Sequence, residues 1–288
     1  MRSSRRLALA VSSAVALGVT GSVLADVRVE PREVEVGGIA IVHTDAPPLR
    51  GTVAGRPLRF FAAPGGGSTA IVGIDLDQGP GSLPIAVEMR GGATESAAVG
   101  VRGKHFPEER LTVPKTYVEP DPATLRRIAR EQKRLAALWT KIEPSRLWDG
   151  EFVAPTNGPA GSPFGLRRFF NGEPRSPHAG IDFRAPEGAP VHASNRGRVV
   201  LADDLFFTGN TIVLDHGLGL FTMYVHLSRL GVRPGVLVDK GDEIGKVGMT
   251  GRATGPHLHF AVRVGEARVD PAALLGCDLA GGSRGVVE

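Results

Sequence analysis

The chain has 288 residues, of which 34 are Lys or Arg and 30 are Asp or Glu, so its formal net charge is +4. Three of the basic residues and none of the acidic ones lie in the first 25 positions, which leaves a net charge of +1 for the remainder. The high isoelectric point is therefore no sign of a nucleic-acid-binding surface, and we expect no nucleic-acid partner. A single cysteine, Cys277, excludes an intrachain disulfide.

The first 25 residues have the layout of a cleavable secretory signal. Three arginines precede an apolar stretch that begins at Leu7, and small residues lead up to Ala25. The apolar stretch is short and interrupted by Ser and Thr, which argues against a stable membrane span. We expect cleavage after Ala25 and a periplasmic or secreted chain.

Residues 26–105 consist of short alternating runs separated by turn residues, for example "EVEVGGIAIVHT" and "LPIAVEMRGG". Turns at such regular spacing are typical of a β-sandwich. The histidines of this region, His43 and His105, are far from the others in sequence, so we expect surface or hydrogen-bonded structural roles for them.

Residues 106–149 form a linker that contains a predicted amphipathic helix. Asp121 is a plausible N-cap with Pro122 at the first helical position, and apolar residues then recur at helical spacing up to Trp139. Basic residues occupy the other faces, which is compatible with binding to an anionic surface. We favour a connector that packs against one or both flanking domains.

Residues 150–276 are rich in glycine and in β-type runs such as "GNTIVLDHG" and "GLFTMYVHLS". No long helical pattern appears, which predicts an antiparallel sheet or a partly open barrel. Residues 277–288 are read as a C-terminal tail. The fold class predicted for the whole chain is therefore mostly β.

The stretch "PHLHF" places two histidines two residues apart. In a strand, His257 and His259 share one face, about 7 Å apart, and the apolar residues that follow each of them share the other face. Such a pair is compatible with metal ligands, with catalytic bases or with two polar residues on a wet surface.

Six of the eight histidines lie between residues 178 and 259, and one of them has a carboxylate nearby. The segment "RSPHAGIDFRAP" holds His178 and Asp182 four residues apart in a predicted loop entering a strand. Zinc accepts His nitrogen and carboxylate oxygen, and a catalytic zinc site needs three protein ligands and an open position. These residues and the later histidine pair supply such a set.

The strand "GLFTMYVHLS" places Tyr224 and His226 on the same face by alternation, and both are candidates to reach a shared cleft. His192 and His216 have no histidine or carboxylate companion at a ligand-like spacing. We expect structural roles for these two.

The motifs "PHAGIDF", "YVHLS" and "TGRATGPHLHF", in this order, resemble the lysostaphin-type zinc endopeptidases of the LytM family, metallopeptidase family 23. The resemblance covers about residues 160–272. It implies one zinc ion per chain, held by His178, Asp182 and His259, with His226 and His257 as catalytic histidines.

The resemblance also implies a function. The chain is expected to be an exported zinc-dependent endopeptidase that hydrolyses peptide cross-links of bacterial peptidoglycan, by means of a zinc-activated water and the two catalytic histidines. The alternative is a non-catalytic LytM-like activator of cell-wall amidases, although such domains typically lack a zinc ligand. The N-terminal domain is expected to contact the wall or to regulate the cleft.

One departure from the family concerns a tyrosine that some relatives carry before the first ligand. This chain has only Tyr117 and Tyr224, so that role is vacant or filled by another residue. Arg167 and Arg168 are candidates to bind substrate carboxylates, and loop scaffolding is an equal alternative. Tyr224 is the third candidate for substrate binding.

Overall fold

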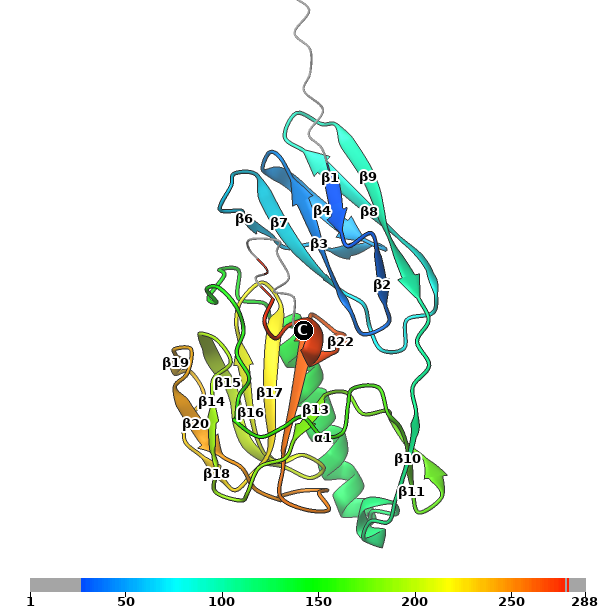
Figure 1. Ribbon diagram of the computed structural model, residues 1–288, viewed down its shortest axis with the longest axis vertical. Coiled ribbons are helices and arrows are strands. Elements are labelled where there is room, and N and C mark those ends of the chain that lie inside the picture. Colours follow the sequence, from blue (N-terminus) through cyan, green and yellow to red (C-terminus); the bar gives the residue numbers. More distant parts are fainter. Residues whose placement is uncertain (1–26, 278, 280–288) are drawn as a thin grey trace, which may run out of the picture.

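The computed structural model describes residues 27–277 and residue 279, so the predicted signal, its cleavage site and nearly all of the predicted tail lie outside the described residues. The described chain is mostly β, as predicted, with N-terminal sheets, a long helix and a C-terminal antiparallel sheet (Figure 1). In this part of the chain, no helix is long and apolar enough to cross a membrane.

Two N-terminal sheets enclose one apolar core. Side chains alternate along their strands, so that Val42 and Val72 from one sheet and Val87 and Val99 from the other are almost fully buried. One sheet has the order β1 (Val27–Glu30), β3 (Ile39–Thr44), β7 (Ser68–Gly73), β6 (Phe60–Ala62). The other has the order β2 (Glu33–Glu35), β9 (Thr94–Arg102), β8 (Gly81–Met89), β4 (Pro48–Val53), β5 (Arg56–Pro57).

The linker contributes a strand and a helix to the C-terminal half. Strand β10 (Glu108–Leu111) pairs in parallel with β11 (Arg167–Phe170), which pairs with β12 (Glu173–Pro174). After the short 3-10 helix η1 (Lys115–Tyr117), helix α1 (Pro122–Thr140) begins where the sequence predicts, because the Asp121 carboxylate accepts hydrogen bonds from the first-turn amides.

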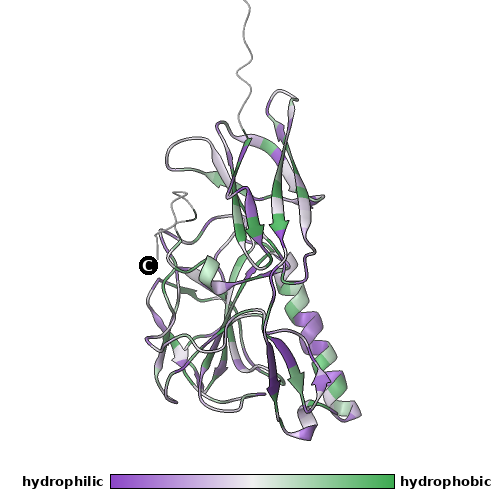
Figure 2. Cartoon of the chain, turned by 45° about the vertical axis from the view of Figure 1, so that its right-hand side comes forward, coloured by the Kyte–Doolittle hydropathy of each residue, from purple (hydrophilic) through white to green (hydrophobic). Residues whose placement is uncertain are grey.

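Helix α1 covers the outer face of the C-terminal sheet (Figure 2). Its residue Trp139 is buried and packs edge-on against Phe221, with ring centroids 5.2 Å apart. The predicted apolar face is only partly used, since Leu125 is exposed. The sheet is therefore buried on both faces here, which explains why its strands read as nearly continuous apolar runs.

The C-terminal domain is built on an antiparallel sheet and a smaller one. The large sheet has the order β13 (Ile181–Phe183), β21 (Leu258–Val264), β17 (Leu220–Leu227), β16 (Gly209–Asp215), β15 (Gly197–Leu205), β19 (Leu237–Val238), with β22 (Ala267–Val269) also paired to β21. The small sheet has the order β14 (Pro190–His192), β20 (Glu243–Lys246), β18 (Arg229–Leu230), and the 3-10 helix η2 (Pro271–Ala273) follows β22.

The two halves of the molecule share a core and a partly buried ion pair. Ile39 and Ile41 of the N-terminal part belong to the same apolar cluster as the C-terminal strands. Beside it, Arg268 donates to Asp75, with an Nη2–Oδ1 distance of 2.6 Å, and to Asp77. Burial acts to raise the pKa of Asp75, but the hydrogen bonds from Arg268 outweigh it and hold that pKa below its usual value.

We expect Arg268→Ala to reduce the free energy of unfolding by about 1.5–3 kcal/mol, because it leaves a half-buried carboxylate without its charged partner. Denaturant titration checks this value. The control is Arg50→Ala, which removes an ion pair to Glu88 from a side chain that is 76% exposed and should cost under about 1 kcal/mol. Equal effects of the two substitutions would contradict the structural role given to Arg268.

Candidate metal centre

Strand pairing brings together two residues that lie 77 positions apart. In the antiparallel ladder of β13 and β21, Asp182 is directly opposite His259. The neighbouring Leu258 and Phe260 are fully buried in the core, so His259 projects from the other face, as the alternation in "PHLHF" predicts. His178 lies in the loop just before β13 and reaches the same point.

The ligand atoms of these three residues converge. His178 Nε2 lies 2.9 Å from Asp182 Oδ1 and 2.8 Å from His259 Nδ1, and His259 Nδ1 lies 2.8 Å from the same carboxylate oxygen. Donor atoms around a tetrahedral zinc at 2.0–2.1 Å are about 3.3 Å apart, so a small movement of these side chains accommodates one ion. The three residues thus form a candidate metal site.

The orientation of the His178 ring is compatible with a cation at this point. Its Nδ1 lies 2.8 Å from the Pro163 carbonyl oxygen and donates to it, so in the neutral imidazole Nε2 carries the lone pair, which faces the cluster. A backbone carbonyl of this kind is the usual partner that fixes the orientation of a metal-binding imidazole. The convergence of this lone pair with a carboxylate oxygen is unfavourable unless a cation or a proton lies between them.

Close backbone packing lets His259 sit in this position. A Cβ atom on Gly180 would lie 2.3 Å from the Phe260 carbonyl oxygen and 2.9 Å from His259 Nε2, both well inside van der Waals contact. The glycine of "PHAGIDF" therefore makes room for the imidazole.

The second oxygen of Asp182 is held by Arg168. Arg168 Nη2 lies 3.3 Å from Asp182 Oδ2, and its Nε donates to Glu109 of the linker strand at 2.9 Å. Burial acts to raise the pKa of Asp182, but the close contacts of its carboxylate with the imidazoles of His178 and His259 outweigh burial and hold that pKa well below the usual range. Asp182 is thus an anion whose Oδ1 is aimed at the two imidazoles.

These contacts bear on the two arginines predicted from the sequence. Arg168 is half-buried and forms ion pairs with Asp182 and Glu109, which is compatible with loop scaffolding. The Arg167 side chain is mostly exposed, and its Nη1 lies 3.9 Å from Glu108 Oε1. A contact of either residue with substrate stays a prediction.

His226 and His257 lie against each other beside the cluster, with ring centroids 4.8 Å apart. Each donates its Nδ1 proton to a backbone carbonyl at 2.8 Å, His226 to Thr250 and His257 to Gly255, so both Nε2 atoms are left as acceptors. His257 Nε2 lies 3.9 Å from Asp182 Oδ1. Burial first, and then the neighbouring imidazoles, lowers the pKa of His226 to about 3, which keeps it neutral.

The prediction that Tyr224 reaches the cleft with His226 is wrong. Tyr224 is fully buried, and its hydroxyl accepts a hydrogen bond from the Ser194 amide at 2.9 Å and lies 3.0 Å from Thr222 Oγ1. His226 has a positive φ of 65°, and the β16–β17 register shifts at this point. This bulge breaks the two-residue alternation, so Tyr224 faces the core while His226 turns toward His257.

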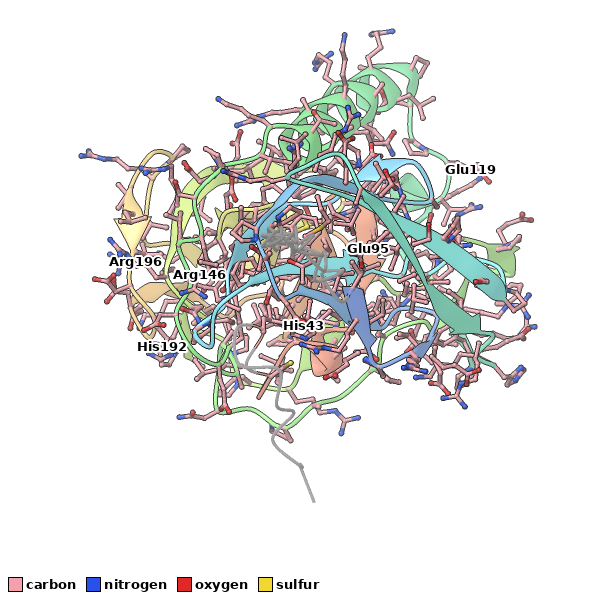
Figure 3. The ribbon with its side chains drawn as sticks, turned by 90° about the horizontal axis from the view of Figure 1, so that it is seen from above. His43, Glu95, Glu119, Arg146, His192 and Arg196 are labelled. Atoms are coloured by element: carbon pink, nitrogen blue, oxygen red, sulfur yellow. The ribbon has the colours of Figure 1, made fainter. Side chains whose placement is uncertain are left out.

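His216 has the structural role that the sequence predicts for it. His216 is fully buried between the Arg196 carbonyl and the Thr222 hydroxyl, each at 2.8 Å, and burial lowers its pKa to about 4. His43 and His192 lie on different parts of the molecule and take no part in the cluster (Figure 3).

A cavity of about 240 Å³ opens beside the cluster and is lined by Asp182, His226 and His257. Three further charged residues line it that sequence reasoning did not single out, namely Glu109, Arg184 and Arg252. Arg252 lies inside the quoted motif "TGRATGPHLHF", so its position was a usable signal. Glu109 comes from the linker, and nothing in its sequence surroundings indicates that it reaches the cavity.

Comparisons with known proteins agree with this geometry. Residues 176–271 match Peptidase family M23. A solved structure from Pseudomonas aeruginosa, assigned to peptidase M23, is 34% identical with a TM-score of 0.69, over 85% of this chain and 95% of that chain.

Two curated relatives match over the same domain. Peptidoglycan DD-endopeptidase ShyB of Vibrio cholerae is 44% identical over 94 residues, which are 33% of this chain and 22% of ShyB. DD-carboxypeptidase/endopeptidase Mpg of Neisseria meningitidis is 40% identical over 113 residues, which are 39% of this chain and 26% of Mpg. The chain thus spans about a quarter of the length of these two relatives.

Replacing any one residue of the cluster is expected to abolish stoichiometric zinc binding, because two ligands remain where three are needed. The variants are His178→Ala, Asp182→Asn and His259→Ala, and the measurement is metal content by mass spectrometry after dialysis against zinc. His192→Ala is the matched control, since His192 lies outside the cluster and should leave the metal content unchanged. Stoichiometric zinc in all three cluster variants would disprove this site.

Proposed function

The chain belongs to peptidase family M23, and from this premise we propose that it is an exported, zinc-dependent endopeptidase that cuts peptide cross-links of bacterial peptidoglycan. The observation that carries the proposal is the convergence of His178, Asp182 and His259 on one point beside two imidazoles with free Nε2 atoms.

The donor set supports zinc as the resident metal. Two imidazole nitrogens and one carboxylate oxygen match a catalytic zinc site with three protein ligands, and no thiolate is among the donors. Bound there, zinc supplies a Lewis acid for the scissile carbonyl and brings the pKa of a water molecule near 7. Arg168 and the Pro163 carbonyl keep two of the ligands aimed at this point.

His226 and His257 supply the proton transfers in this proposal. Because each Nδ1 proton is engaged by a backbone carbonyl, each Nε2 is free to take the proton of the attacking water. The two rings lie next to each other in the lining of one cavity, so both acceptors are beside the cluster. Once protonated, either imidazole is able to donate to the leaving nitrogen of the peptide or to the developing oxyanion.

Peptidoglycan is proposed as the substrate because the two curated relatives that match this domain carry peptidoglycan DD-endopeptidase and DD-carboxypeptidase/endopeptidase activities in their names. The wall lies outside the cytoplasmic membrane, so this substrate agrees with the export predicted from the first 25 residues. The linker strand that lines the cavity supports a regulatory or wall-contacting role for the N-terminal domain.

The purified chain is expected to release peptide fragments from bacterial cell walls, to stop when a chelator removes the metal, and to resume when zinc is added back. Mass spectrometry of the fragments identifies the bond that is cut. A metal-free chain that leaves walls intact would instead favour the amidase activator.

His226→Ala and His257→Ala are each expected to reduce kcat by about 10²–10⁴-fold, since each removes a proton acceptor. Zinc content should stay stoichiometric in both variants, because neither side chain is a proposed ligand. Loss of zinc from either variant would overturn this division between ligands and bases, and full activity would exclude a catalytic role.

A further inference from the structure

Arg252 is held by aromatic rings at the wall of the candidate active-site cavity. Its guanidinium carbon lies 4.4 Å from the centroid of the Phe170 ring and 4.6 Å from that of Phe207. Its backbone amide donates to the Phe207 carbonyl oxygen at 2.8 Å, which ties the loop to the same support. Cation–π contacts of this kind fix a guanidinium by its faces and leave its N–H edge available.

No acidic side chain neutralises Arg252 within residues 27–277, where no ion pair or side-chain hydrogen bond of its guanidinium is found. The nearby Arg168 is different, because it is paired with both Glu109 and Asp182. Burial first, and then the charges of Arg168 and Arg175, lowers the pKa of Arg252 to about 10, so it stays a cation at neutral pH. The cavity therefore contains a positive charge with no partner of its own.

The position of Arg252 indicates which part of a substrate it faces. It lies in the loop of residues 250–257, which also holds His226 through the Thr250 carbonyl and contains His257. Arg252 and both histidines line the same cavity. In the proposed reaction, a group bound by Arg252 would therefore lie close to the imidazoles that protonate the leaving nitrogen.

We propose that Arg252 binds a substrate carboxylate attached to the carbon that bears the scissile nitrogen. This inference rests on the proposed function and specifies its substrate. A D-alanyl–diaminopimelate cross-link has such a carboxylate, and so does a D-alanyl–D-alanine terminus, whereas a glycine bridge has none. A guanidinium edge pairs with a carboxylate through two parallel hydrogen bonds, so Arg252 selects the first two substrates over the third.

The test compares two synthetic cross-linked peptides that differ only in whether this carboxylate is free or converted to a carboxamide. We expect the zinc-loaded chain to cut the acid with a kcat/KM about 10- to 100-fold above that of the amide. Arg252→Met, which keeps the apolar contact with the rings, should lower kcat/KM for the acid to the level of the amide and leave the amide nearly unchanged. Arg252→Lys should restore part of the preference.

Arg110→Gln is the matched control. Arg110 also stacks on a phenylalanine of β11, at 4.4 Å from the Phe169 centroid, but it pairs with Glu108 and does not line the cavity. Its replacement should leave the preference for the acid intact.

The two ways of failing give different results. If Arg252→Met lowers kcat/KM equally for both peptides, or if the unaltered chain cuts both equally well, the role of Arg252 is overturned while the endopeptidase function stands. If the unaltered chain cuts neither peptide, the proposed function fails. In that case, calorimetric binding of both peptides to the full chain tests the role of Arg252 separately. Tighter binding of the acid that is lost in Arg252→Met supports the inference. Equal binding of the acid and the amide overturns it.

Discussion

The candidate active site depends on the register of a single strand pair. Asp182 and His259 face each other only because β13 and β21 pair with Ile181 opposite Phe260 and Phe183 opposite Leu258. The apolar residues of both strands are buried on the core face, so a shift by one residue would turn those residues toward solvent and both ligands into the core. The hydrophobic core thus sets the geometry of the polar site, and no separate interaction is needed to bring the two ligands together.

The charged groups around this pair form a continuous series of contacts that runs outward from the imidazoles. Asp182 uses one oxygen for the imidazoles and the other for Arg168, and Arg168 is in turn balanced by Glu109. Backbone carbonyls fix the orientation of His178, His226 and His257 by accepting their Nδ1 protons. The site is therefore preorganised by groups that orient the ligands and bases without reacting themselves. A rigid sheet supports such an arrangement because it fixes the positions of these groups.

The sequence predicts those parts of the site that follow strict alternation or a short motif. The opposite faces of His259 and Leu258, the N-cap at Asp121 and the mostly β fold all follow from local rules. The opposite faces of Tyr224 and His226 do not follow from these rules. A positive φ at His226 breaks the alternation of the strand, and nothing in "YVHLS" predicts that positive φ. The position of Glu109 could not be predicted either. It depends on the parallel pairing with Arg168, 59 residues away, and local sequence patterns do not indicate which distant strands pair.

The parallel pairing of β10 with β11 has a mechanical consequence. The segment that follows the N-terminal sandwich is paired by backbone hydrogen bonds with the strand that contains Arg168, so this part of the linker is held against the C-terminal domain. A displacement of this segment relative to the C-terminal domain would move Glu109 and with it the ion pair that Glu109 makes with Arg168. The position of the linker strand is thus coupled to the carboxylate of Asp182 through two consecutive ion pairs.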